Sequence, residues 1–167
     1  MYNQNYIFSL GGTILNHDLD QPLNIDNQIC FALYDANKRF NKFYSEILAE
    51  FKLTYPQYLV LSTLWDAKDG QISMRELGNC INLDSGTLTP LLKRLEQHGW
   101  ISRQKDRDDE RHVIVKLTTA AEQKRALIVS KVKNGINRLD LPKKDYQKRV
   151  DEINDITRRL DSIIPEI

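Results

Sequence analysis

The sequence predicts a mainly α-helical fold with one small β-hairpin, and two neighbouring patterns indicate it. Residues 83–100 read LDSGTLTPLLKRLEQHGW, in which leucines recur at helical spacing after small polar residues. Val113–Leu117 alternates between apolar and polar side chains, as a half-buried strand does. A shorter helical pattern precedes the first segment, so the expected fold is a helix-turn-helix followed by a hairpin, or wing, with further helices at both ends of the chain.

The helix expected within residues 83–100 has the layout of a helix that reads DNA. Asp84 or Ser85 is a natural N-cap, because a short side-chain oxygen there accepts a backbone N–H. Leucines form the apolar face. Thr87 and Thr89 then lie near the exposed N-terminal end, where a recognition helix meets base edges.

The helix before it is expected over residues 73–82. Ser73 and Glu76 have the spacing of a capping box, and Leu77 and Ile81 fall on one apolar face. The two helices follow each other so closely that only a tight turn fits between them.

The segment after Gly99, the expected C-cap, predicts the wing, with a charged tip over residues 104–110. An isolated charge run is usually a solvated loop. Beside a helix-turn-helix we interpret it as a DNA contact instead. Arg111 is expected to enter the minor groove, and Asp109 to brace its guanidinium.

Composition agrees with this interpretation without proving it. The chain has 167 residues, 28% of them charged and 41% hydrophobic, which suits one globular domain. A net charge of +1 is too small to indicate nucleic-acid binding by itself. Basic residues are in modest excess between Lys93 and Lys116, where Lys93 and Arg94 are expected on phosphates.

Other classes of protein lack support in the sequence. No apolar run approaches the ~18 residues of a membrane helix, and no basic segment precedes the apolar N-terminal patch, so we expect a cytoplasmic protein without a membrane partner. The three histidines are scattered, and there is no phosphate loop, nucleophile elbow or Cys-x-x-Cys motif. We therefore expect no enzyme activity, no metal and no cofactor.

The helical patterns divide the chain into three expected regions. Long amphipathic helices over 26–51, 118–139 and 143–163 carry more apolar surface than one small core needs, which favours an interlocked homodimer over a monomer capped by long helices. The regions are an N-terminal extension (1–25), a helical dimerisation region (26–53 with 119–167) and a winged helix-turn-helix DNA-binding region (54–118).

Two cysteines are present, Cys30 and Cys80, and both are expected to be reduced. Cys30 lies near the start of the first long helix, where free N–H groups and the helix dipole stabilise a thiolate that reacts with peroxides. A cysteine on an apolar helix face is more often a small buried hydrophobe, and the residues alone favour that alternative.

The run from Leu77 to Thr118 resembles the multiple-antibiotic-resistance regulators (MarR), and most of all their organic-hydroperoxide-sensing repressors. The resemblance rests on LDSGTLTPLLKRLE, on Asp109-Glu110-Arg111 and on the closing VIVKLT. It covers about residues 26–163, and LDSGTLTPLL is specific to this branch.

The resemblance implies a dimeric winged-helix repressor that binds a pseudo-palindromic double-stranded operator and releases it when an organic hydroperoxide oxidises Cys30. Family sensors place their reactive cysteine there. Tyr34 follows one turn later, and Tyr44 and Tyr55 match tyrosines that reach the thiol from the partner subunit. Because no cysteine follows Cys80, oxidised Cys30 is expected to be capped by a low-molecular-weight thiol or overoxidised, in preference to a disulfide with Cys80.

Two other functions fit the same fold. The protein responds to a small aromatic ligand with Cys30 inert, or it uses the winged helix for protein contacts alone. Operator binding with and without hydroperoxide separates these alternatives.

Overall fold

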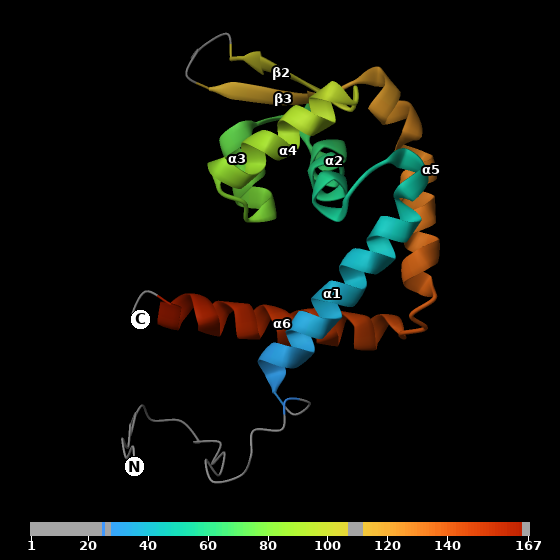
Figure 1. Cartoon of the computed structure of the whole chain (residues 1–167), viewed down its shortest axis with the longest axis vertical. Coiled ribbons are helices and arrows are strands. Elements are labelled where there is room, and N and C mark those ends of the chain that lie inside the picture. The colour runs from blue at the N-terminus through green and yellow to red at the C-terminus, as the bar shows by residue number, and fades with distance from the viewer. Residues whose placement is uncertain (1–24, 26–27, 107–111, 165–167) are drawn as a thin grey trace. The chain divides into compact units, whose positions relative to one another are not determined.

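The computed structural model describes Ile25, residues 28–106 and residues 112–164 (Figure 1). The chain divides into two units, 1–39 and 40–167, and the boundary falls inside the first helix. The helices are α1 (Ile29–Ile47), α2 (Tyr55–Asp66), α3 (Met74–Ile81), α4 (Ser85–Gln97), α5 (Thr119–Asn137) and α6 (Lys143–Ile163); the strands are β1 (Gln71–Ser73), β2 (Ile101–Lys105) and β3 (Val113–Leu117).

The mainly helical fold with a wing hairpin is confirmed, with one more strand than expected. The antiparallel sheet has the order β1-β3-β2, so the hairpin gains β1 on its other edge. Val115 on β3 lies opposite both Ile72 and Arg103, and it is fully buried. Three residues are too few to show an alternating pattern, so β1 left no signal in the sequence.

The core of the second unit gathers around α2. This helix contacts α3, α4, α5 and β3. Its residues Val60, Leu61 and Leu64 are fully buried, and each buried side chain of this size stabilises the fold by about 1.5–3 kcal/mol. Thr54 and Gln57 form a capping box, in which the Thr54 backbone N–H donates to Gln57 Oε1 at 2.9 Å.

The two helices of the helix-turn-helix have well-defined ends (Figure 1). Ser73 Oγ accepts the Glu76 N–H at 3.2 Å, and the Glu76 carboxylate accepts the Ser73 N–H at 3.2 Å, so the predicted capping box is confirmed. Asn82, in the left-handed region at φ 52°, ends α3. Asp84, one of the two predicted N-caps, then accepts the Thr87 N–H at 2.9 Å and starts α4.

The long helix expected over residues 26–51 is shorter in the structure. α1 ends at Ile47, and a 3₁₀ turn over Ala49–Phe51 follows, with Lys52 left-handed at φ 54°. This turn lets Leu48 and Leu53 both enter the core, where they are 0% and 4% exposed. The break therefore follows from tertiary packing, which periodicity along one segment does not reveal.

The end of α4 fixes the start of the hairpin. Gly99, at φ 73°, directly follows the C-cap residue, and the N–H of Trp100 donates to the Leu95 carbonyl at 3.0 Å. Arg103 on β2 then donates from Nη2 to Glu96 Oε2 at 2.7 Å and from its backbone N–H to Oε1 at 3.0 Å. These bonds lower the pKa of Glu96 and join the wing to α4.

We expect Gly78→Ala to lower the free energy of unfolding by about 1–3 kcal/mol, although alanine favours a helix. A Cβ at Gly78 lies 2.9 Å from the Leu83 carbonyl oxygen, which belongs to the backbone of the turn. Urea denaturation at fixed protein concentration measures the change. Asn79→Ala, at the exposed neighbouring position, is the control and stays within about 0.5 kcal/mol of wild type. Equal stability of the two variants would contradict the tight turn.

Candidate nucleic-acid interface and thiol site

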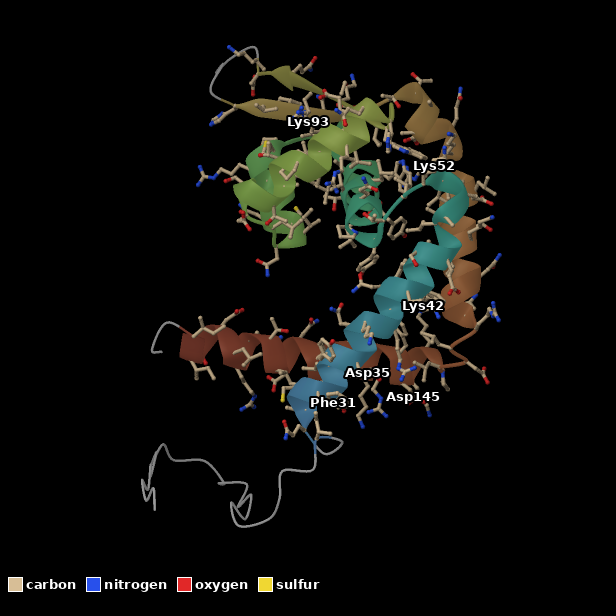
Figure 2. All side chains as sticks on the ribbon, viewed as in Figure 1. Phe31, Asp35, Lys42, Lys52, Lys93 and Asp145 are labelled. Atoms are coloured by element: carbon tan, nitrogen blue, oxygen red, sulfur yellow. The ribbon has the colours of Figure 1, made fainter. Side chains whose placement is uncertain are left out.

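One face of α4 is polar and exposed. Leu88, Leu92 and Leu95 are at most 1% exposed and pack into the core. The predicted contact residues lie on the other side of the helix, where Lys93 is visible in Figure 2. All of them are exposed: Ser85, Thr87, Thr89, Lys93 and Arg94.

The hydrogen bonds at the N-terminus of α4 assign a different role to Asp84. Its two carboxylate oxygens accept the backbone N–H and the hydroxyl of Thr87, each at 2.9 Å, and these bonds lower its pKa. The Thr89 hydroxyl donates to the Ser85 carbonyl at 2.7 Å. Both threonine protons are therefore used within the helix, and the free lone pairs face outward as acceptors for base amino groups. Asp84 is better placed to position Thr87 than to meet an anionic phosphate.

The wing is described only at its base. Asp109 and Arg111, which the sequence places at the minor groove, lie outside the described residues, so their role stays a prediction. Arg103, by contrast, is 25% exposed and is held by Glu96. Its guanidinium supports the hairpin, and we do not count it among the phosphate contacts.

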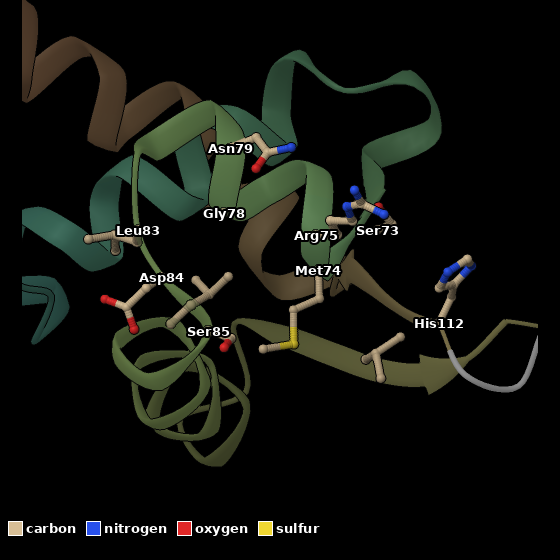
Figure 3. A pocket seen from close by; sticks show the side chains of 11 residues that line it. Ser73, Met74, Arg75, Gly78, Asn79, Leu83, Asp84, Ser85 and His112 are labelled. Carbon is tan, nitrogen blue, oxygen red and sulfur yellow. The ribbon is translucent and has the colours of Figure 1, made fainter. Parts of the chain in front are cut away.

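A hollow of about 390 Å³ lies beside α4, between the two helices of the helix-turn-helix and β3 (Figure 3). The Met74 side chain reaches between the helices toward Ser85, and Arg75 and His112 lie toward the wing side. The sequence analysis did not single out this hollow or exposed Arg75, because neither forms a pattern along one segment. Arg75 adds a cation to the face that carries the exposed N-terminus of α4.

Cys30 lies in the first turn of α1 and is exposed. Its Sγ donates to Gln28 Oε1 at 3.5 Å, a contact that needs the thiol proton. Tyr34 is 62% exposed and lies one turn further on, with its ring 6.4 Å from that of Phe31. An exposed thiol is open to a soluble oxidant, unlike the buried hydrophobe that the residues alone favour.

The predicted sensor tyrosines of the second unit lie together. The Tyr44 and Tyr55 rings stack at 4.1 Å, and Tyr58, which the sequence analysis did not single out, stacks on Tyr44 at 5.9 Å. Burial raises the pKa of Tyr44 to about 12 and also raises the pKa of Tyr55. Both phenols therefore remain protonated donors at neutral pH. Cys30 belongs to the other unit, so its approach to these phenols stays a prediction.

Two further searches of the described residues found nothing. Within them, no group of three or more His, Cys, Asp or Glu side chains is arranged to hold a metal ion. No helix in that part of the chain has the length and apolar character to cross a bilayer.

Known transcriptional regulators resemble the middle of the sequence. The HTH-type transcriptional regulator TtmR of Methylorubrum extorquens is 52% identical over 99 residues, which are 59% of this chain and 50% of that protein. The organic hydroperoxide resistance transcriptional regulator of Bacillus subtilis is 43% identical over 96 residues, which are 58% and 64% of the two chains. The matched part thus spans between half and about two thirds of these relatives.

Solved structures of AbfR from Staphylococcus epidermidis share the fold. Reduced AbfR bound to DNA matches with a TM-score of 0.73 and 33% identity, over 84% of this chain and 94% of that one. Overoxidised AbfR bound to DNA and disulfide-formed AbfR match at 34% identity, with TM-scores of 0.69 and 0.63.

The family model of the transcriptional regulator SarA/Rot matches residues 42–128, just over half of the chain. This segment runs from the second half of α1 through the helix-turn-helix and the wing into α5. The predicted winged helix and the resemblance to the MarR regulators are confirmed, and the chain belongs to the SarA/Rot-type winged-helix transcriptional regulators of the MarR family.

Proposed function

We propose that this chain is a DNA-binding repressor that acts as a homodimer and releases its operator when Cys30 is oxidised. The observation that carries the DNA-binding part is the exposed polar face of α4, which lies opposite three buried leucines and beside the wing. AbfR, which shares this fold, was solved on DNA in both its reduced and overoxidised forms.

Each side chain of the interface has a distinct task in this proposal. Ser85, Thr87 and Thr89 meet base edges in the major groove, and Lys93 and Arg94 neutralise phosphates. Arg111 enters the adjacent minor groove, with Asp109 beside it. Two copies bind half-sites about 34–36 Å apart, so the operator is a pseudo-palindrome.

The apolar surface of α6 supports the dimer. No residue of α6 is buried, although Ile153, Leu160 and Ile163 are each nearly half exposed along this amphipathic helix. Water does not favour so much exposed apolar surface on one helix. We infer that residues 119–167, together with 26–53, form the dimerisation region and that a second copy covers α6, while residues 54–118 bind DNA.

The relatives support the redox part of the proposal. One is named for organic hydroperoxide resistance, and another was solved in reduced, overoxidised and disulfide-formed states. The Cys30 thiolate attacks the peroxide, which yields a sulfenic acid and an alcohol. A small cellular thiol then condenses with the sulfenic acid, which gives a mixed disulfide and water. Since overoxidised AbfR was solved on DNA, we favour the thiol cap as the releasing state.

Tyr44 and Tyr55 serve this reaction as hydrogen-bond donors toward sulfur, and Tyr34 supports them on α1. Their raised pKa values keep the phenols of Tyr44 and Tyr55 protonated at neutral pH. A bulky cap on Cys30 breaks these contacts and changes the spacing of the two α4 helices. Because both half-sites must be bound at once, a small change in spacing removes most of the affinity. Such a regulator acts in the cytoplasm, where reduced small thiols are abundant.

We expect Thr89→Val and Lys93→Ala to weaken binding in different ways, measured against an operator selected from random duplexes. Thr89→Val should cost about 1–3 kcal/mol on the operator and leave binding to random DNA unchanged, because it removes one base contact. Lys93→Ala should weaken both and lower the salt slope by about one per contact. Arg111→Ala should cost the most. Wild-type affinity of both Arg111→Ala and Thr89→Val would contradict the interface.

We expect Cys30→Ser to bind the operator with wild-type affinity and to remain bound after treatment with cumene hydroperoxide and free cysteine. The matched control is Cys80→Ser, which keeps the other exposed thiol and should release DNA as wild type does. Gel-shift titration measures release, and intact-protein mass measures the cap. Release by Cys30→Ser but not by Cys80→Ser would move the sensor to α3. Release by neither oxidised wild type nor oxidised Cys80→Ser would favour a ligand-controlled regulator.

A further inference from the structure

A row of aromatic rings runs along one face of α2. Tyr55, Tyr58 and Trp65 are three and seven residues apart, so they lie on the same side of the helix. Tyr44, from the C-terminal part of α1, stacks on Tyr55 at 4.1 Å and on Tyr58 at 5.9 Å. The Tyr58 ring meets the edge of Trp65 at 6.4 Å. Ring contacts therefore run without a gap from Tyr55 through Tyr44 and Tyr58 to Trp65.

Tyr58 is the only described ring that touches both Tyr44 and Trp65. It is half-buried, and its side chain is hydrogen-bonded to Ser62, one turn further along α2, which fixes the ring orientation. The proposed function uses Tyr44 and Tyr55 but gives no role to Tyr58. A pair of stacked rings is worth about 0.5–1.5 kcal/mol beyond its buried area, so Tyr58 holds Tyr44 firmly against α2.

Trp65 is the part of this row that lies in the DNA-binding region. It is 6% exposed, and its buried Nε1 has no hydrogen-bond partner in the described structure. Packing alone therefore sets the position of the indole, and the ring can follow a displacement of Tyr58. The opposite face of α2 carries the leucines of the core, and the helix contacts α3 and α4 directly.

We infer that Tyr58 is a positioning residue that couples the sensor tyrosines to the winged helix. It holds the Tyr44 ring against α2, so that a displacement of Tyr44 and Tyr55 is passed to Trp65 and to the helix-turn-helix. This inference rests on the proposed function, in which oxidation at Cys30 displaces those two tyrosines. It adds the route by which the displacement reaches α4.

Fluorine NMR of the full chain labelled with 5-fluorotryptophan tests the route directly. The chain has two tryptophans, and Trp65→Phe assigns their two resonances. Trp100, buried at the end of α4 under the Lys124 ammonium at 4.9 Å, serves as the internal comparison. Oxidation by cumene hydroperoxide and cysteine should shift the Trp65 resonance more than that of Trp100. An unmoved Trp65 resonance in protein that has released DNA would overturn the inference.

Two variants separate coupling from plain packing. Tyr58→Leu removes the ring, whereas Tyr58→Phe keeps it and loses the bond to Ser62. Tyr58→Leu should need roughly 2- to 30-fold more hydroperoxide for half-release, the range that one coupling residue contributes, and should lose the Trp65 shift. Tyr58→Phe should restore both. Reduced Tyr58→Leu should bind the operator as wild type does, with Cys30 capped to the same extent by mass.

The outcomes distinguish this inference from the proposed function. If Cys30→Ser still releases DNA on oxidation, the proposed function fails. If Cys30→Ser holds DNA while Tyr58→Leu releases it at the wild-type dose, only the coupling role of Tyr58 fails. If Tyr58→Leu does not fold, the Trp65 resonance of the wild-type protein decides the question.

Discussion

Burial of the leucine face of α4 is the interaction on which the rest of this structure depends. Leu88, Leu92 and Leu95 have almost no exposed surface, and each contributes about 1.5–3 kcal/mol. The N-cap at Asp84 adds about 1 kcal/mol, and exposed ion pairs add about 0–1 kcal/mol each. The leucines therefore decide which side of α4 faces the core, and the polar side must face solvent.

The helix α2 connects this interaction to the thiol chemistry. One of its faces carries leucines and valine into the core, and the other carries the tyrosines that stack on Tyr44. Packed interiors are dense and transmit displacements instead of absorbing them. A change at the tyrosines therefore acts on the same helix that supports α4, which gives the chain a physical link between oxidation and the DNA-reading face.

Local patterns in the sequence were enough for much of the fold. The capping box of Ser73 and Glu76, the leucine spacing of α4 and the proline before α6 all act within one segment, and the helices appear where these signals place them. Contacts between distant segments gave no such signal. β1 pairs with a strand about forty residues later, and Arg103 bonds to Glu96 across a chain reversal. The turn after Ile47 likewise exists because the core accepts Leu48.

The candidate site divides in the same way. Cap and hydroxyl positions on α4 could be predicted, since a helix fixes the face on which each residue lies. The helix could not reveal that Asp84 is committed to Thr87, because Ser85 was an equally good cap. Tyr58 was missed because its importance lies in the ring of Tyr44, which reaches it from another helix.

Dimethyl sulfate footprinting of the operator complex tests most directly that the exposed face of α4 reads the major groove. This reagent methylates guanine N7, which lies in that groove. We expect protection in two successive major grooves about 34–36 Å apart, and its loss when Ser85, Thr87 and Thr89 are together replaced by alanine. Protection in one groove alone, or protection that survives the triple replacement, would contradict this account.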